Sequence, residues 1–168
     1  ELSTAEASAA APGWRYLLGR LHLTTDWADF GEAASFVAAV AELAGALVHH
    51  PEVDLRGNRV HLAVGTHEVA AVTSRDVTLA NRVSVLVHER GGHPVPTALT
   101  EVEIAIDTMD AAAILPFWKA VLDYAEDGDD ALIDPQRIGP PVWFQQLHEP
   151  RDVRNRIHLD VTVAHDVA

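Results

Sequence analysis

The chain has 168 residues, of which 48% are hydrophobic and 22% are charged, so it is suited to one or two folded domains and is not a disordered segment. Its formal net charge of −13 disfavours nucleic acid as a partner, and the absence of cysteine excludes disulfides, thiolate zinc sites and cysteine nucleophiles. No apolar run approaches the ~20 residues of a membrane helix, and the N-terminus lacks the pattern of a signal peptide, so we expect a cytoplasmic protein without membrane contacts.

The predicted elements begin with two helices separated by extended chain. Ser3 and Glu6 have the spacing of a capping box, which predicts a short N-terminal helix. Residues 14–23 read as extended structure. Asp29 then begins a long helix that ends before Pro51, because the residue preceding a proline avoids helical angles. The apolar side chains of this helix recur at helical spacing: Phe36, Val40, Leu43 and Leu47.

A strand and another long helix follow. Apolar residues alternate with other residues over 60–64, the pattern of a half-buried strand, and we expect His67 at the end of this strand. Thr73 and Asp76 have the spacing of a capping box and open the next helix, whose apolar side chains continue to Val87. Helices and strands in this order predict a small α+β domain.

The segment HERGGHPVPTA, residues 88–98, is rich in Gly, Pro and His and has no apolar period. It therefore marks a boundary between two modules. We predict a first domain over residues 1–90, a linker over 91–100 and a second domain over 101–168. The acidic residues are concentrated in the second domain and the histidines in the first, which also indicates two modules.

The second domain is predicted to contain a strand, a helix and further strands. Residues 101–106 alternate as a strand, and Asp110 caps the helix that follows. Residues 131–134 and 142–147 read as short strands, and residues 156–163 alternate again. The result is a β-α-β-β unit followed by one more strand.

Residues 49–80, HHPEVDLRGNRVHLAVGTHEVAAVTSRDVTLA, carry a specific combination of short motifs. The HHPE tetrad is followed by an Asn ahead of a strand, by Thr-His at the end of the strand, and by Arg-Asp before Leu-Ala. This combination resembles the pterin carbinolamine dehydratases (4a-hydroxytetrahydrobiopterin dehydratases), and the resemblance covers residues 2–90. It implies an antiparallel sheet with helices on one face, and the dehydration of 4a-hydroxytetrahydropterin to quinonoid dihydropterin.

The resemblance also implies a site made of acid–base side chains. Hydroxide is a poor leaving group, so the reaction needs a general acid, and the departing ring proton needs a base. Histidine can serve as either near neutral pH, and no cofactor is required. The catalytic residues implied are His49, His50, His67 and Asp76, and the substrate-binding residues implied are Pro51, Glu52, Thr66 and Glu68.

Some positions depart from the family pattern. Relatives carry a Trp after HHPE and a Tyr before the Asn, whereas this chain has Val53 and Gly57; relatives carry glycine after Thr-His, whereas this chain has Ala70 and Ala71. The missing aromatic rings would have stacked on a flat pterin. An alternative is therefore a non-catalytic copy of the fold that serves as a binding or assembly module, in which Asp76 acts only in its capping box.

The second half resembles the glyoxalase-like domains of the vicinal oxygen chelate superfamily, through the segments EVEIAIDTMD, PFWKAVLDY, VWFQQL and RIHLDVTV. Such domains pair two βαβββ modules around a metal site. This chain holds one module and the first strand of another, so we expect more chain or a partner to complete it. The ligands implied by position are Glu103, Gln145 and His158, which suit Zn, Ni, Fe or Mn. A second alternative is therefore a metal-dependent lyase or dioxygenase, or a small-molecule-binding protein, centred on this half.

Both resemblances imply association between copies of the chain. The dehydratases form dimers and tetramers, and an incomplete glyoxalase-like half favours pairing. We therefore expect a homo-oligomer that acts on a small pterin.

Overall fold

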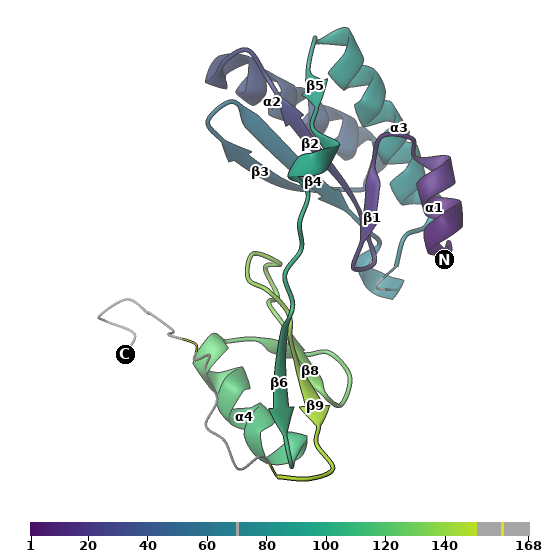
Figure 1. Cartoon of the computed structure of the whole chain (residues 1–168). Coiled ribbons are helices and arrows are strands. Elements are labelled where there is room, and N and C mark those ends of the chain that lie inside the picture. Colours follow the sequence, from purple (N-terminus) through teal and green to yellow (C-terminus); the bar gives the residue numbers. More distant parts are fainter. Residues whose placement is uncertain (70, 151–158, 160–168) are drawn as a thin grey trace. The chain divides into compact units, whose positions relative to one another are not determined.

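The structure is a computed structural model that describes residues 1–69, 71–150 and 159 (Figure 1). The chain divides into two compact units, Glu1–Thr100 and Glu101–Ala168. The elements of the first unit are, in chain order, α1 (Thr4–Ala10), β1 (Arg15–Leu17), β2 (Arg20–Asp26), α2 (Phe30–Leu47), β3 (Glu52–Arg56), β4 (Arg59–Val64), the 3-10 turn η1 (His67–Val69), α3 (Ser74–Glu89), β5 (His93–Pro94) and the 3-10 turn η2 (Pro96–Ala98).

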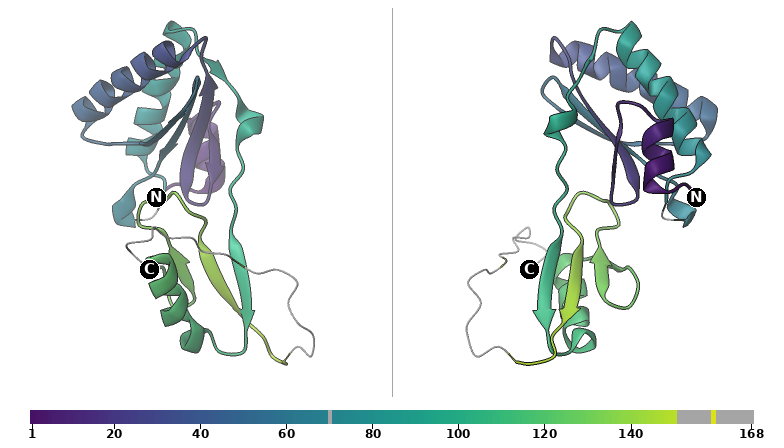
Figure 2. Two further views of the ribbon diagram at one scale, coloured as in Figure 1. Left: turned by 90° about the vertical axis from the view of Figure 1, so that its left-hand side faces the viewer. Right: turned by 45° about the vertical axis from the view of Figure 1, so that its right-hand side comes forward.

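The first unit contains one sheet with its two long helices on one face (Figure 1, Figure 2). The strand order is β1-β2-β4-β3, all pairings are antiparallel, and β5 pairs with the end of β2. The predicted α+β class, an antiparallel sheet with helices on one face, is confirmed. Apolar side chains of β2 and β4 pack with those of α2 and α3 in a core that includes Leu21, Leu23, Phe36, Val40, Val60, Leu62, Val64, Leu79 and Val83.

The capping side chains predicted from the sequence begin the helices. Ser3 and Glu6 form the capping box of α1, and Thr73 and Asp76 form the capping box of α3. The side chain of Asp29 accepts a hydrogen bond from a backbone N–H in the first turn of α2. Each of these caps satisfies a backbone N–H that the first helical turn leaves without a partner.

The strand β3 is absent from the predicted elements. It forms a hairpin with β4 through a two-residue loop, Gly57-Asn58. Gly57 has a φ of 60°, which suits the first central position of a type II′ turn and favours glycine there. Asn58 anchors the loop, because its Nδ2 donates to the Trp27 carbonyl at 2.6 Å and its own carbonyl accepts from the Trp27 N–H at 2.9 Å. The position at which relatives carry Tyr is therefore a turn position in this chain.

Part of the predicted linker, residues 91–100, belongs to the sheet. The helix α3 ends at Glu89, and residues 93–94 then pair with the end of β2 as β5. The Val95 N–H donates to the Thr24 carbonyl at 2.8 Å, so the segment continues alongside β2. A local pattern rich in Gly and Pro does not reveal this pairing, because the partner strand is far away in the sequence.

The helix α2 meets the length and composition requirements of a membrane-crossing helix. This is weak evidence, because the core helices of folded proteins meet the same requirements. No other helix among the described residues meets them. Several side chains of α2 are buried within the first unit: Ala33, Phe36, Val40 and Ala44.

The second unit contains a smaller sheet with one helix on one side (Figure 2). Its elements are β6 (Ile104–Thr108), α4 (Ala111–Leu122), β7 (Ala125–Glu126), β8 (Ala131–Ile133) and β9 (Val142–Gln146). The sheet order is β6-β9-β8-β7, with β6 parallel to β9 and the other pairings antiparallel. This is the βαβββ module that the resemblance implies, although β7 is absent from the strands predicted by the sequence pattern. Residues 156–158 and 160–163 of the predicted final strand lie outside the described residues. The core between α4 and the sheet consists of Leu115, Leu132, Val142 and Phe144.

The chain after α3 passes close to the buried ring of Trp27, so Gly92 has no room for a side chain. A Cβ atom at Gly92 would lie 2.6 Å from Cζ2 of Trp27, whose buried ring stacks on Phe36 with centroids 4.5 Å apart. The ring cannot move without disturbing the core, so we expect Gly92→Ala to lower the free energy of unfolding by ~1–3 kcal/mol in urea unfolding. Gly45→Ala is the control, because a Cβ there meets no atom within 4 Å and should leave the stability equal or raised. Equal stability of the two variants would contradict the prediction.

Candidate active site

Asp76 lies at the centre of a buried polar cluster at the start of α3. Its Oδ1 lies 2.6 Å from Nε2 of His49, and its Oδ2 lies 2.7 Å from Oγ1 of Thr66. The same Oδ2 lies 2.7 Å from the backbone nitrogen of Thr73 and 2.9 Å from its Oγ1. The side chain of Asp76 is fully buried. The capping box explains only the contacts to Thr73, so Asp76 also organises residues outside its own helix.

The surroundings of Asp76 favour its ionised form. Burial by itself raises the pKa of this carboxyl, but hydrogen bonds from Thr66, from the Thr73 backbone and from His49 outweigh burial, and the pKa lies below its ordinary value. A carboxylate can only accept hydrogen bonds, so Nε2 of His49 carries the proton that lies between the two side chains. In the neutral ring of His49 the acceptor lone pair is then on the second nitrogen, Nδ1.

His49 and His50 are adjacent in the sequence but differ in exposure. The helix α2 ends with Val48 in the left-handed conformation, after which His49 turns toward Asp76 and is only 9% exposed. His50 is exposed. Nη2 of Arg75 donates to the Val48 carbonyl at 2.9 Å, which ties the end of α2 to the start of α3. The protein therefore holds one histidine of the pair in place and presents the other to solvent.

His67 is connected to this cluster through the chain. The strand β4 ends at Val64, so His67 does not end the strand as predicted but opens η1, with an exposed side chain. The preceding residue, Thr66, contacts Asp76 and closes a short loop through a 3.0 Å hydrogen bond from its N–H to the Ala71 carbonyl. Ala71 has no positive φ, so this position does not require glycine, and Ala70, the other position at which relatives carry glycine, lies outside the described residues.

The other residues implied for substrate binding lie in the same two segments. Pro51 and Glu52 are half-buried at the start of β3, and Glu68 is exposed in η1. Glu52 forms an ion pair with Arg20, whose Nε is buried without a hydrogen-bond partner in the described part of the chain. A Cβ at Gly65 would lie 2.9 Å from Cγ of Arg20, so the arginine packs on the end of β4. The ion pair therefore links the HHPE segment to the segment that leads to η1.

The structure does not bring Glu103 and Gln145 together. In the parallel pairing of β6 with β9, Gln145 lies beside Asp107, and Glu103 comes four residues before Asp107. At a rise of about 3.3 Å per residue this separates Glu103 from Gln145 by ~13 Å, beyond the reach of one metal ion. His158 lies outside the described residues. These side chains therefore do not fit one metal site in the described part of this unit.

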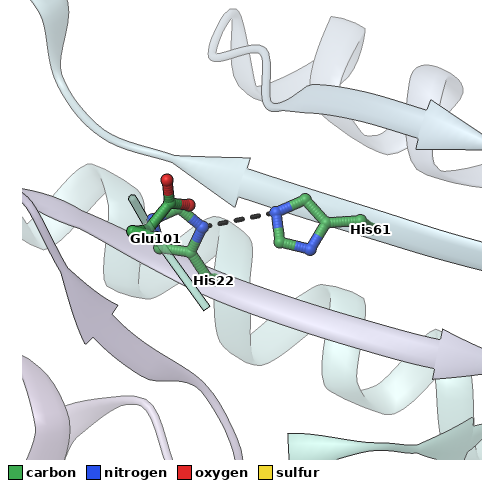
Figure 3. Close-up of side chains that lie close together, drawn as sticks. All are labelled: His22, His61 and Glu101. Atoms are coloured by element: carbon green, nitrogen blue, oxygen red, sulfur yellow. Dashed lines mark hydrogen bonds between the residues drawn. The ribbon is translucent and has the colours of Figure 1, made fainter. Parts of the chain in front are cut away.

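A second pair of histidines, which the sequence patterns do not reveal as a site, lies in the sheet of the first unit. Nδ1 of His22, which is fully buried on β2, lies 3.3 Å from Nε2 of His61 on β4 (Figure 3). Nε2 of His22 lies 3.2 Å from the Leu17 carbonyl, and Nδ1 of His61 lies 3.0 Å from Oγ1 of Thr24. Burial, followed by the positive charges of Arg20 and His61, lowers the pKa of His22 to about 4. The sequence suggests only a surface position for His61, because it alternates with the apolar residues of its strand.

The sequence model of the family described as Pterin 4 alpha carbinolamine dehydratase matches residues 1–86, just over half of the chain. The chain belongs to this family. The resemblance seen in the HHPE and Thr-His motifs is thereby confirmed, and the family is one of hydro-lyases that need no cofactor. The sequence model described as Glyoxalase-like domain matches residues 103–168, which confirms the second resemblance.

Curated relatives of this dehydratase-family chain carry the name “Putative pterin-4-alpha-carbinolamine dehydratase”. The relative from Thermomicrobium roseum is 44% identical over 75 residues, which cover 45% of this chain and 81% of that protein. The relative from Acidobacterium capsulatum is 37% identical over 82 residues, which cover 49% of this chain and 89% of that protein. A crystal structure titled transcriptional coactivator/pterin dehydratase, from Brucella melitensis, is 30% identical, covers 51% of this chain and 97% of that chain, and has a TM-score of 0.49.

Proposed function

We propose that the first unit dehydrates 4a-hydroxytetrahydropterin to quinonoid dihydropterin by histidine general acid/base catalysis. The observation that carries this proposal is the buried pair of His49 and Asp76. The exposed His50 directly follows His49 in the chain, and the exposed His67 directly follows Thr66, which also contacts Asp76. Membership of the dehydratase family supports the class of reaction. The arrangement supports the chemistry, because one imidazole is oriented by a buried carboxylate and two others are open to a substrate.

The three histidines divide into one that Asp76 orients and two that are exposed to a substrate. Asp76 holds Nε2–H of His49, so that this imidazole keeps one orientation and one tautomer. His50 and His67 are exposed and can reach a substrate that arrives from solvent. An imidazolium donates a proton to the hydroxyl that leaves carbon 4a, and a neutral imidazole accepts the proton that leaves the ring. The balance is the loss of one water molecule, with no change of oxidation state.

The residues proposed to lie beside the substrate fall into two groups. Thr66 and Glu52 are already held by other side chains, which suits them to positioning the two histidine-bearing segments. Pro51 and Glu68 lie directly next to the exposed histidines in the sequence and are the ones we propose to contact the pterin. Val53, 41% exposed on β3, takes the place of the aromatic ring in relatives and provides an apolar surface without stacking.

The rate of carbinolamine dehydration, with the spontaneous rate subtracted, tests this proposal. We expect the wild-type chain to accelerate the reaction, and His50→Ala and His67→Ala each to reduce the acceleration by ~10²-fold or more. His88→Ala is the matched control, because His88 is exposed in α3 twelve residues after Asp76, ~18 Å along the helix. Its activity should equal that of the wild type.

Two results would contradict the proposal. If a high concentration of the wild-type chain does not accelerate carbinolamine dehydration, the proposed dehydratase function is wrong. A non-catalytic binding or assembly module would then be favoured. Full activity of both His50→Ala and His67→Ala would keep the reaction but remove these histidines from it.

We also propose that the chain is a cytoplasmic homo-oligomer, a dimer or a tetramer. In the described part of the chain β3 has a strand partner on one side only, so its other edge can pair with another copy. Sedimentation of the full chain measures the oligomeric state, and a monomer at all concentrations would contradict this proposal.

A further inference from the structure

We propose that His22 and His61 form a binding site for a divalent transition-metal ion of the zinc, nickel and copper type. The two side chains project from neighbouring strands of the first unit, β2 and β4, and point toward one another (Figure 3). They share no residue with the Asp76 cluster, and the dehydration proposed above does not use them. The site would therefore be a second functional feature of the same unit.

The strand register brings the two histidines together. In the antiparallel pairing of β2 with β4, Thr24 lies opposite His61 and His22 lies opposite Ala63, so the two histidines are diagonal neighbours on one face of the sheet. Both alternate with core residues, which places them on the face away from α2 and α3. Backbone pairing on both strands holds this arrangement in place.

The distance between the facing nitrogens suits one ion. Nδ1 of His22 and Nε2 of His61 are 3.3 Å apart, and an ion bound to both at about 2.05 Å would have an N–metal–N angle of about 107°. This angle is close to the tetrahedral value that zinc prefers. An ion bound to both nitrogens would take the place of the present hydrogen bond, with each ring turned so that its lone pair points to the ion, which lies off the line between the two nitrogens.

The outer nitrogens of both rings already have the partners that metal-binding histidines require. The Leu17 carbonyl can only accept, so Nε2 of His22 carries a proton and Nδ1 offers its lone pair. The Thr24 hydroxyl can donate or accept, so on metal binding the proton of His61 moves from Nε2 to Nδ1 and is donated to Oγ1 of Thr24. Histidine ligands commonly donate their second N–H to a carbonyl or similar acceptor, which fixes the ring and the tautomer.

The ligand type and the burial define the class of ion. Neutral imidazole nitrogens suit zinc, nickel and copper, whereas magnesium and calcium require oxygen ligands. His22 is fully buried and His61 is half-buried, so the ion would be reached from the side of His61. Water or a small anionic ligand would occupy its remaining positions.

Calorimetric titration of the full chain with Zn²⁺ at pH 7.5, after removal of metal with EDTA, tests the proposal. We expect one site per chain, with affinity reduced by at least ~10-fold in His61→Gln. Thr24→Val keeps both histidines and the shape of the side chain but removes the outer acceptor, and should weaken binding by ~10-fold. Co²⁺ bound to the wild type should show the absorption of tetrahedral coordination.

The double variant His50→Ala/His67→Ala distinguishes this site from the exposed histidines near Asp76, and it should bind Zn²⁺ like the wild type. Circular dichroism and the Tm of metal-free protein show whether each variant is folded. If His61→Gln does not fold, Thr24→Val alone tests the site. Absence of binding to the wild type would overturn the proposal. Wild-type affinity in both His61→Gln and Thr24→Val would place the ion elsewhere and overturn it as well.

Discussion

Replacing Asp76 with Asn is expected to reduce dehydratase activity by ~10²-fold or more and to lower the free energy of unfolding by ~3 kcal/mol. The carboxylate accepts from His49 with one oxygen and from Thr66 and Thr73 with the other. An amide has one acceptor oxygen, so its NH₂ group would face a donor on one of the two sides. If that side is His49, the imidazole must take the other tautomer, with its proton on Nδ1.

The two effects of Asp76→Asn can be measured on the same preparation, by the dehydration rate and by urea unfolding. Asp54→Asn is the matched control, because Asp54 pairs with Arg56 at the surface with nearly half of its side chain exposed. Loss of an exposed pair of this kind should change the stability by less than ~1 kcal/mol. Wild-type activity and stability in Asp76→Asn would show that the residue is only a helix cap.

The pH dependence provides a further readout for Asp76. Because the pKa of this carboxyl is lower in the folded chain than its ordinary value, its contribution to stability is fully present above about pH 4. The contribution is lost as the pH falls through the folded pKa, where the folded state also binds the proton. Asp76→Asn should therefore lack this part of the acid sensitivity that the wild type shows.

Acidification from pH 7 to pH 4 is expected to lower the free energy of unfolding by about 3 kcal/mol through His22 alone. Burial is the main cause, because it lowers the pKa of His22 from 6.5 to about 4 in the folded chain. Between these values the unfolded chain binds a proton at His22 that the folded chain does not bind. The stability from this residue is therefore complete above about pH 6.5 and falls by up to ~1.4 kcal/mol per pH unit below it.

Urea unfolding between pH 4 and pH 7.5, with EDTA present, measures this dependence. The pH dependence of the wild type is compared with that of His22→Gln, whose side chain cannot take up a proton. Carboxylates titrate in both proteins, so their contributions cancel in the difference between the two. His88→Gln removes an exposed histidine and should keep the slope of the wild type. An equal slope in His22→Gln and in the wild type would show that another group causes the acid sensitivity.

Local sequence patterns were sufficient to predict where the helices of this chain begin. A capping side chain bonds to a backbone N–H two or three residues away. Pairs such as Ser3 with Glu6 and Thr73 with Asp76 therefore indicate a helix start without information from distant parts of the chain. The HHPE and Thr-His motifs were likewise sufficient for the family, which the matching sequence models confirm for both halves of the chain. The strand β3 and the pairing of β5 with β2 were not predictable in this way.

The helix starts, the α+β class and the family were predictable from the amino-acid sequence, because each depends on residues that are close together in the chain. Which side chains meet became clear only from the folded chain. It joined His49 to Asp76, brought His22 to His61 across two strands, and placed Gln145 beside Asp107 instead of Glu103. The physical reason is that strand register and helix packing depend on contacts between distant segments, and a shift of one residue along a strand changes every neighbour.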